Sequence, residues 1–221
     1  MLTFLARHAR SVHSQNGEDG IIEECLRRIP EFDGYRFNGE TDHSEGHVVE
    51  IGANNGLWLS NSRLLIEQGW SGTLVESSWE LWNECRNNYA NNPKVKCVCS
   101  AVDRYNVNAF VKSNCVVMSS DTDGLDYQIF EGMRERPAVV IVEIDSSYLP
   151  DVVAFNSDGG ASYRAMAELA RRKQYRVLCH TGNLVLIRDE DFHLFPELTD
   201  ELEQADLYFN RSWVPATQEA Q

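Results

Sequence analysis

The chain has 221 residues, of which 43% are hydrophobic and 24% are charged. These values are ordinary for a globular protein, and the length suits one α/β domain with its own core. A net charge of −14 with scattered basic residues argues against a nucleic-acid partner, because such partners require a basic surface. No apolar run approaches the roughly 20 residues of a membrane helix, and the first residues lack a signal peptide's apolar region. We therefore expect a cytoplasmic protein without a membrane anchor.

The first expected element is a helix over Ile21–Ile29, preceded by the polar segment Ser14–Asp19 and ended by Pro30. A polar connection over 31–47 leads into alternating strands and helices. The expected strands are 48–52, 73–76, 95–99, 116–120 and 138–144, and the expected helices are 60–68, 79–90, 107–112, 127–134 and 163–172. Two closing strands, 175–180 and 184–188, flank a hairpin turn at 181–183.

Alternation of this kind is typical of a mostly parallel sheet with helices on both faces. We therefore predict an α/β fold of the single-domain, Rossmann-like kind, in which a C-terminal hairpin adds an antiparallel strand at the end of the central sheet. The domain is expected to cover 1–195, with an N-terminal helical cap over 1–47. Residues 196–221 are expected to form an acidic tail.

The stretch from 48 to 77 carries the most specific pattern. It reads as strand, glycine turn, helix and strand, and Glu50, Gly52 and Gly56 form an E-x-G-x-x-x-G turn. Glycines let the backbone approach a ligand closely, and a carboxylate that ends the second strand, here Glu76, can accept both hydroxyls of a ribose. The pattern therefore predicts a nucleoside site.

The chemistry of the turn limits which nucleoside fits. The turn lacks the G-x-G-x-x-G spacing that presses a helix N-terminus against a diphosphate. Asn54 occupies its tight part, and Glu50 places negative charge beside it. A carboxylate there repels a diphosphate and can accept from an ammonium group. The expected ligand has a ribose and an amino-acid end, so S-adenosylmethionine fits and NAD fits poorly. The structural alternative is an α/β turn that binds no ligand.

Acidic residues follow the other predicted strands as well. The carboxyl ends of parallel strands meet at one edge of a sheet, where ligands of open α/β folds bind. Asp103 follows the third strand, where it can accept from an adenine amino group or stand as an ordinary surface aspartate. The full set of acids at strand ends is Glu50, Glu76, Asp103, Asp121, Asp123, Glu143 and Asp145.

The run Asp121-Thr122-Asp123-Gly124 has three interpretations. Carboxylates this close can bind a divalent cation such as Mg²⁺, with Asp121, Glu143 and Asp145 as the ligands. One of Asp121, Asp123 and Asp145 can instead act as a general base, its pKa raised by the other acids. The third interpretation is structural: Asp123 or Asp126 caps the helix that follows. His180, at a strand end, is a weaker candidate base.

S-adenosylmethionine commonly donates a methyl group, and the sequence after the fourth strand indicates which kind of group would accept it. Enzymes that methylate exocyclic base nitrogens usually show an (N/D)-P-P-(Y/F) loop there, and this chain has Ser120-Asp121-Thr122-Asp123. A hydroxyl or carboxyl acceptor is therefore favoured over adenine or cytosine.

Taken together, these segments make the chain resemble the FkbM-like class I methyltransferases, which use S-adenosylmethionine. The resemblance covers roughly residues 14–190. It depends on segments in a fixed order: SQNGEDGII at 14–22, VVEIGANNG at 48–56, GWSGTLVE at 69–76, DTDGLDYQIFEGM at 121–133, RPAVVIVEID at 136–145 and GASY at 160–163. The family pattern D-(I/V)-(E/D)-G at the fourth strand is matched with Thr122 at its middle position.

The resemblance implies a class I methyltransferase fold and a role for each matched residue. Glu50, Gly52 and Gly56, with Asn54 between them, would line the methionine end of the cofactor. Glu76 and the adjacent Ser77 would contact the ribose, and the region of Val102 and Asp103 the adenine. Asp121 would lie close to the reactive methyl group. The segment Ser14–Asp19 would cover the pocket, so that Gln15 and Glu18 contact ligand.

The expected function is therefore S-adenosylmethionine-dependent O-methylation of a hydroxyl on a small molecule or a sugar or glycan. One alternative is a module that binds S-adenosylmethionine without turnover. The other is a methyltransferase that acts on nucleic-acid or protein acceptors.

Overall fold

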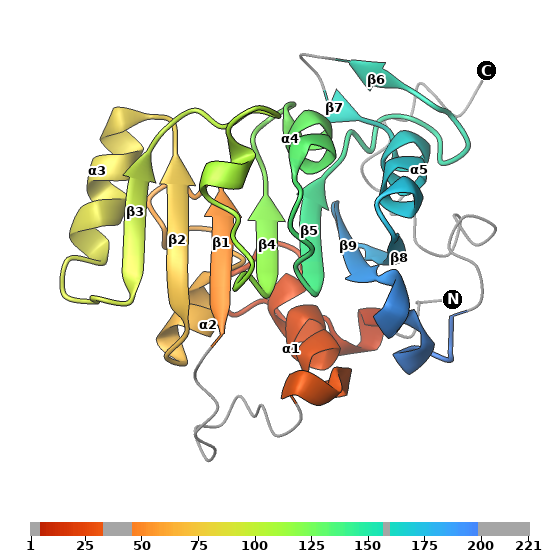
Figure 1. The fold of residues 1–221 in the computed structure, drawn as a ribbon, viewed down its shortest axis with the longest axis horizontal. Coiled ribbons are helices and arrows are strands. Elements are labelled where there is room, and N and C mark those ends of the chain that lie inside the picture. The colour runs from red at the N-terminus through yellow and green to blue at the C-terminus, as the bar shows by residue number, and fades with distance from the viewer. Residues whose placement is uncertain (1–4, 33–45, 157–159, 199–221) are drawn as a thin grey trace.

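The computed structural model describes residues 5–32, 46–156 and 160–198, which fold around a seven-stranded sheet (Figure 1). The strands lie in the order β3-β2-β1-β4-β5-β9-β8 across the sheet. They are β1 (His47–Ile51), β2 (Ser71–Glu76), β3 (Val95–Cys99), β4 (Val117–Ser120), β5 (Val139–Glu143), β8 (Tyr175–His180) and β9 (Asn183–Arg188). The first five are parallel, which confirms the predicted mostly parallel α/β sheet.

The strand order reverses at β1. This strand pairs in parallel with β2 on one side and with β4 on the other, so the chain leaves the middle of the sheet in both directions. Crevices form outside the carboxyl ends of parallel strands at such a switch point, and ligands bind there. The topology therefore predicts a ligand site at the carboxyl ends of β1, β2 and β4.

The predicted C-terminal hairpin is present, but its antiparallel strand lies inside the sheet. β9 runs antiparallel to both β5 and β8, and β8 forms the edge. The buried apolar run Leu184–Ile187 pairs with the equally apolar β5, which explains why β9 occupies the inner position.

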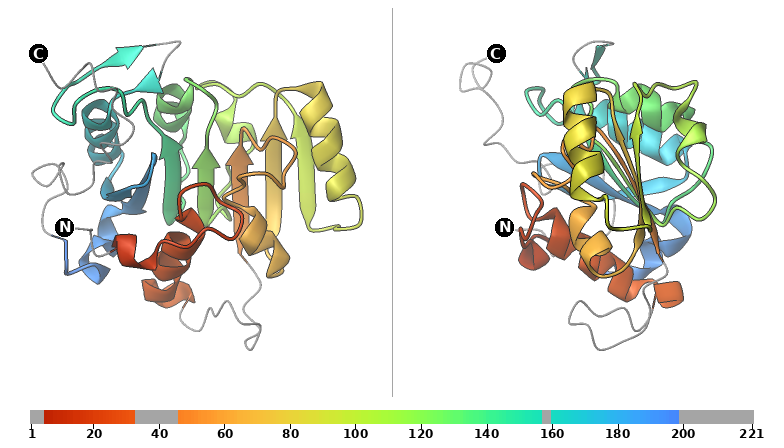
Figure 2. Two further views of the ribbon diagram at one scale, coloured as in Figure 1. Left: turned by 180° about the vertical axis from the view of Figure 1, so that it is seen from behind. Right: turned by 90° about the vertical axis from the view of Figure 1, so that its left-hand side faces the viewer.

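Helices cover both faces of the sheet (Figure 2). On one face lie α1 (Glu18–Arg28), α2 (Arg63–Glu67) and α3 (Trp79–Asn88), and on the other lie α4 (Asp126–Gly132) and α5 (Tyr163–Arg172). The described residues also form short 3-10 helices at Leu5–His8, Pro30–Phe32, Val107–Ala109 and Asp189–Leu194.

Helix α5 illustrates how the sequence produces these elements. The Ser162 hydroxyl caps it by accepting from the backbone N–H of Ala165. Met166, Leu169 and Ala170, at helical spacing, are buried against the sheet. The last turn carries basic residues, which suit the negative end of the helix dipole.

Several local predictions differ from the structure. Helix α1 begins at Glu18 and not at Ile21, and the helix expected over 60–68 is confined to Arg63–Glu67. The helix expected over 107–112 is a 3-10 turn. Between the strand expected over 138–144 and the helix expected over 163–172, where no strand was predicted, the chain forms a short antiparallel pair, β6 (Phe155–Asn156) and β7 (Gly160–Ala161).

Two predicted segments fall largely outside the described residues. The acidic tail is described only to residue 198, and the connection over 31–47 is not described between 33 and 45, so both stay predictions. Within the described ranges, none of the helices combines the length and apolar character that crossing a membrane requires.

Candidate active site

A cleft of about 390 Å³ opens at the carboxyl ends of β1, β2 and β4. Its walls come from residues that follow these strands, from the loop after β3 and from the segment before α1. The predicted cofactor residues that line it are Gln15, Glu50, Gly52, Asn54, Glu76, Ser77 and Asp121. The structure therefore brings residues that are far apart in sequence to one ligand-sized cavity.

The carboxylate of Glu50 organises the loop that follows the glycine turn. It is buried, and it accepts hydrogen bonds from the hydroxyls of Ser60 (2.7 Å) and Ser62 (2.5 Å) and from the backbone N–H of Asn61 (2.8 Å). Burial raises the pKa of Glu50, and these three donors oppose the rise. Because 60–62 are held by Glu50, helix α2 begins only at Arg63.

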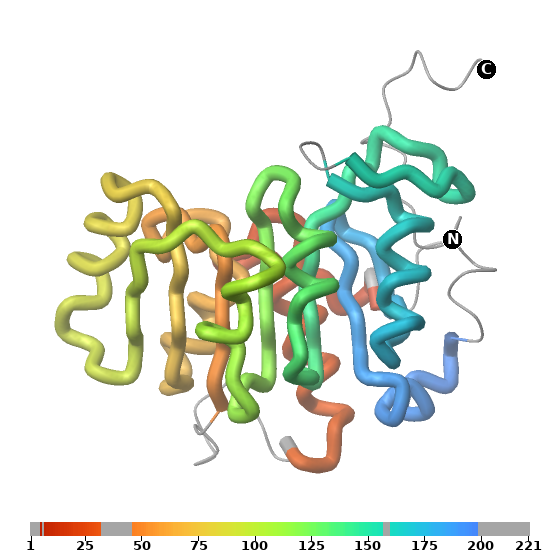
Figure 3. Tube along the Cα trace, turned by 45° about the horizontal axis from the view of Figure 1, so that its top comes forward, coloured from red at the N-terminus to blue at the C-terminus, as the bar shows by residue number. Residues whose placement is uncertain are grey.

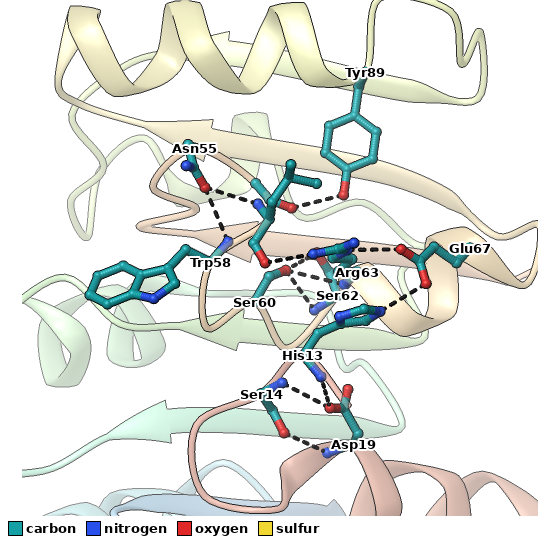
Figure 4. A network of polar contacts seen from close by, with 12 residues as sticks. His13, Ser14, Asp19, Asn55, Trp58, Ser60, Ser62, Arg63, Glu67 and Tyr89 are labelled. Carbon is teal, nitrogen blue, oxygen red and sulfur yellow. Dashed lines mark hydrogen bonds and ion pairs between the residues drawn. The ribbon is translucent and has the colours of Figure 1, made fainter. Parts of the chain in front are cut away.

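Hydrogen bonds with Asn55 and Arg63 also hold the first part of this loop (Figure 4). Arg63 donates through Nη1 to the carbonyl of Leu57 (3.2 Å) and through Nε to Glu67 (2.8 Å). Asn55 accepts from the backbone N–H groups of Leu57 and Trp58. The loop is therefore fixed at both ends, and the Trp58 side chain, 64% exposed, lies at the wall of the cleft.

The segment before α1 is tied to the same region (Figure 4). One oxygen of Asp19 accepts from the backbone N–H groups of Val12, His13 and Ser14 at 2.7–2.8 Å. The imidazole of His13 lies 2.8 Å from Glu67 of α2. In Figure 3 this segment, in red, passes behind the central strands. These contacts hold Gln15 at the cleft.

Glu76 ends β2 with its carboxylate fixed by the backbone. One oxygen accepts from the N–H of Asn54 at 2.8 Å, and the other accepts from the N–H of Ser78 at 2.7 Å. The Glu76 side chain lines the cleft, although the residue is only 8% exposed. A carboxylate oxygen can accept more than one hydrogen bond, so each oxygen of Glu76 retains capacity for a ligand hydroxyl.

Gly52 is required by packing inside the protein. Its φ is +78°, and a Cβ atom built there would lie 1.8 Å from the carbonyl oxygen of Asp121. The loop after β4 therefore crosses directly over the turn after β1. This close approach brings Asp121 into the cleft.

Replacing Gly52 by alanine is expected to lower the free energy of unfolding by about 3 kcal/mol or more, since overpacking is added to backbone strain. Gly160→Ala is the matched control, because φ is also positive (+86°) but the added Cβ meets only Asp145 at 3.7 Å. Urea unfolding measures both. Equal losses in the two variants would contradict the packing role of Gly52.

Gly56 and Asp103 lie behind the cleft and do not line it. A Cβ at Gly56 would meet the ring of Tyr89 and the thiol of Cys85 at 2.7 and 2.8 Å, so this glycine lets α3 approach the turn. The carboxylate of Asp103 accepts from the backbone N–H groups of Tyr105 (2.7 Å) and Asn106 (3.0 Å). Val102, beside it, does line the cleft.

Glu18 also faces the protein. It is fully buried and accepts from the Thr181 hydroxyl (2.7 Å) and the backbone N–H of Asn16 (2.8 Å). Its contribution in this structure is to join the N-terminal segment to the hairpin turn.

Three carboxylates meet at the far end of the cleft. Oxygen atoms of Asp121, Asp123 and Glu143 all lie within 4.8 Å of one another. Asp123 adopts a left-handed conformation (φ +55°), which is uncommon for a residue with a side chain and turns the loop toward β5. The predicted metal set contained Asp145 in place of Asp123; the structure gives Asp145 another position, described below.

Crowding changes the protonation of this cluster. Burial, followed by the charges of Asp126 and Asp123, raises the pKa of Asp121 to about 6. Burial and the neighbouring Asp121 raise the pKa of Glu143 to about 9, so at neutral pH Glu143 is protonated and donates to Asp121. A carboxylate that titrates near neutrality beside a neutral carboxylic acid is a suitable proton acceptor.

Asp126 supports the cluster from behind. It is 2% exposed and accepts from the Ser120 hydroxyl (2.5 Å) and from the backbone N–H (3.2 Å) and hydroxyl (3.0 Å) of Thr122. The prediction that Asp123 or Asp126 caps α4 is wrong: Asp126 is the first residue of the helix, the cap position is Leu125, and no side chain caps the helix there.

A second cavity, of about 360 Å³, adjoins the cleft. Asp145 lines it, and one carboxylate oxygen of Asp145 accepts from the backbone N–H of Ser147 at 2.9 Å. Ser146 also lines it, and its hydroxyl lies 2.8 Å from Nε2 of His180. The two cavities share the residues Gln15, Asp121, Asp123 and Asn183, so the acidic cluster lies at their junction.

Sequence reasoning missed Asn61 and Asn183. Asn61 lines the cleft and is 6% exposed, and its carboxamide oxygen has no hydrogen-bond partner among the described residues. Asn183 comes from the hairpin, far along the chain. The available signal for Asn61 was the Ser-Asn-Ser run at 60–62, which stands at the start of a predicted helix. For Asn183 the sequence offered no signal except its position in the predicted hairpin turn.

Comparisons with known proteins bear on the fold. No family model matches the chain, and no curated protein does. Among solved structures, the chain is similar to monomeric WbdD, with 13% identity, a TM-score of 0.51, and coverage of 81% of this chain and 42% of that one. It is also similar to an S-adenosylmethionine-dependent methyltransferase from Clostridium acetobutylicum, with 12% identity, a TM-score of 0.49, and coverage of 80% and 93%.

A third similar structure is the mitomycin 7-O-methyltransferase MmcR, with 17% identity, a TM-score of 0.43, and 77% of this chain matched to 56% of that one. The chain thus spans little more than half of MmcR and less than half of WbdD. At this level of identity the likeness concerns the fold alone. Together with the strand order, the likeness to WbdD confirms the predicted Rossmann-like α/β fold.

Proposed function

We propose that this protein is an S-adenosylmethionine-dependent methyltransferase that acts on a hydroxyl of a small molecule or a sugar. The observation that carries the proposal is Glu76, a carboxylate fixed by two backbone N–H groups at the end of β2, inside a ligand-sized cleft that ends at Asp121. A fixed carboxylate with free lone pairs is suited to the two hydroxyls of a ribose.

The charge of the cleft supports this cofactor over a phosphate-bearing one. The described residues that line the cleft include Glu50, Glu76, Asp121 and Asp123 but no lysine, arginine or histidine. A diphosphate would find no cationic partner here. The sulfonium and ammonium groups of S-adenosylmethionine are cations, and an acidic wall stabilises both.

The cofactor's orientation follows from Glu76. With the ribose at Glu76, the adenine extends toward Ser100 and Val102 of the loop after β3, and the methionine end lies toward Glu50 and Asn61. The unpartnered carboxamide oxygen of Asn61 is an acceptor suited to the ammonium group. Glu50 already accepts from three donors, so in this proposal it contributes mainly charge.

The reaction needs little beyond alignment and removal of one proton. The sulfonium is already an activated donor, so the enzyme must place an acceptor oxygen in line with the methyl group. The methyl moves from sulfur to oxygen, S-adenosylhomocysteine leaves, and the hydroxyl proton passes to a carboxylate. Asp121 is the proposed base because it borders both cavities and its pKa is raised to about 6. Asp123 and Asp145 are the other candidates.

A divalent cation is the second candidate for this cluster. Asp121, Asp123 and Glu143 offer oxygen ligands within 4.8 Å of one another, which is the donor type that Mg²⁺ prefers. Such an ion would hold the acceptor and lower the pKa of its hydroxyl. If a carboxylate is the base, a chelator should leave methyl transfer within about twofold of its untreated rate. Loss of activity that Mg²⁺ restores would favour the metal.

Calorimetry and product analysis test the proposed function. S-adenosylmethionine should bind the full chain and NAD should not, and a candidate acceptor should gain one methyl group by mass spectrometry. Binding without transfer to any hydroxylated acceptor would favour a non-catalytic binding module. Salt-sensitive binding to an oligonucleotide would favour a nucleic-acid acceptor. No binding of S-adenosylmethionine would overturn the proposal.

A further inference from the structure

Two cysteines lie in contact behind the turn that follows β1. Cys85 belongs to α3 and Cys97 to β3, the edge strand of the sheet, and these two elements lie side by side (Figure 1). Their sulfur atoms are 3.4 Å apart, and the Cys85 thiol donates to the Cys97 sulfur. A disulfide needs the two sulfur atoms at about 2.05 Å, so a small approach is enough to join them.

The two thiols differ in burial and in acidity. Cys85 is 1% exposed, and its hydrogen bond to Cys97, together with burial, raises its pKa. Cys97 is half-buried, and the same hydrogen bond lowers its pKa, although burial opposes this. The thiolate is the form of cysteine that attacks oxidants. Cys97 is therefore the reactive member of the pair, and Cys85 is in place to react with it next.

The other cysteines lack this combination. Cys25, Cys115 and Cys179 are buried, and burial raises the pKa of each thiol. Cys99 is exposed, but its sulfur lies 4.0 Å from the Ser77 carbonyl, and a carbonyl oxygen does not stabilise a thiolate. Within the described ranges, the Cys85 and Cys97 thiols belong to no group of three or more metal ligands, so a metal site is not indicated.

The pair lies directly behind the cleft. A Cβ atom built on Gly56 would lie 2.8 Å from the Cys85 sulfur, so this thiol fills the space behind the turn after β1. Leu81, one helical turn before Cys85, lines the cleft, and so does Ser100, just after the end of β3. A bond between the two sulfur atoms therefore joins two elements that carry walls of the cleft.

We propose that Cys85 and Cys97 form a redox-active thiol pair, which a hydroperoxide converts into a disulfide. The Cys97 thiolate attacks one oxygen of hydrogen peroxide and the O–O bond breaks. The leaving hydroxide takes up the proton that Cys97 had released, and Cys97 becomes a sulfenic acid. The Cys85 sulfur then attacks the Cys97 sulfur and displaces the hydroxyl group, which leaves as water with the Cys85 proton. Two thiols are oxidised to one disulfide, and the peroxide is reduced to two molecules of water.

Peroxide treatment of the full chain, followed by thiol titration and peptide mapping, tests this assignment. At pH 7 an equimolar amount of hydrogen peroxide should remove two of the six thiols of the reduced protein. Digestion should then yield one linked peptide pair, which contains Cys85 and Cys97, and dithiothreitol should restore both thiols. The measurement needs neither cofactor nor acceptor, so its result is independent of methyl transfer.

Three serine variants separate the roles of the cysteines. Cys97→Ser removes the reactive thiolate and should lower the initial rate of thiol loss at least about tenfold. Cys85→Ser keeps a hydroxyl donor beside Cys97, and its oxidation should stop at the sulfenic acid, which dimedone traps. Cys99→Ser is the matched control on the same strand and should still form the disulfide.

The original protein alone can overturn the proposal, even if a variant fails to fold. A disulfide between Cys97 and Cys99, a dimer linked through Cys99, or retention of both the Cys85 and Cys97 thiols under peroxide would contradict it. Thiol loss that is equally fast in Cys97→Ser would contradict it as well, because another cysteine would then be the reactive one.

Discussion

Replacing Glu76 by alanine should lower the affinity for S-adenosylmethionine by about 100-fold or more. Each hydrogen bond from a ribose hydroxyl to a carboxylate contributes about 1.5–3 kcal/mol, and the variant loses two of them. It also leaves the backbone N–H groups of Asn54 and Ser78 without their acceptor, so the turn after β1 loses its fixed shape. Isothermal titration calorimetry with S-adenosylhomocysteine measures the loss without interference from turnover.

Two controls separate ribose recognition from a general loss of structure. Glu168→Ala removes a half-buried acid from an ion pair on α5, outside the cleft, and should leave the affinity unchanged. Glu76→Gln keeps the size of the side chain and one acceptor oxygen. In the original protein the 2′-deoxyribose analogue of S-adenosylhomocysteine should bind more weakly than the parent compound, and in both Glu76 variants this difference should shrink. A Glu76 variant that still discriminates between the two ligands would refute the ribose assignment.

The features of the fold that were predictable are those with a local cause. Apolar runs such as Val139–Val142 identify central strands wherever they lie, and alternation with helices fixes a parallel sheet. The two-residue strands β6 and β7 have no periodicity of their own, and they pair only because the chain folds back near Asp145. Elements that form only through a contact made by the folded chain therefore could not be predicted from local sequence patterns.

The residues of the site also divide into those with a local sequence signal and those whose role depends on a distant contact. Glu50 and Glu76 were identified because an acid at a strand end must face the switch point of the sheet. The serines that hold Glu50 read as the beginning of a helix, since hydroxyl residues commonly occupy that position. For Gly52 the sequence indicated close approach of a ligand, whereas the contact that excludes a side chain is with the Asp121 carbonyl. The spacing of the glycines predicts that a side chain is excluded at this position, but it does not show which part of the protein or ligand excludes it.

Asp121→Asn should lower kcat by a factor of about 100 or more while cofactor affinity changes only a few-fold. General-base catalysis typically contributes about 10²–10⁴ in rate, and an amide cannot accept the proton. Removing one acid from the wall of the cleft costs part of the attraction for the sulfonium but none of the contacts to the ribose. Single-turnover rates and calorimetry on the same preparation separate the two effects.

The pH dependence supplies a second, independent readout. Asp121 accepts a proton only when it is ionised, and its pKa is raised to about 6, so the rate of the original protein should rise as the pH increases through about 6. This acid limb should vanish from the residual activity of Asp121→Asn. An unchanged limb would assign the base to another group, with Asp123, Asp145 and His180 the first to test.

Glu143 distinguishes a carboxylate base from a metal at the same cluster. With its pKa raised to about 9, Glu143 is a neutral donor to Asp121 at pH 7, and glutamine preserves that donor. Glu143→Gln should therefore retain most of the activity at pH 7 if Asp121 is the base. If the cluster holds Mg²⁺, the same substitution replaces an anionic ligand by a neutral one and should weaken the ion's binding strongly. High activity in Glu143→Gln together with low activity in Asp121→Asn would leave proton transfer to Asp121 as the interpretation that accounts for both.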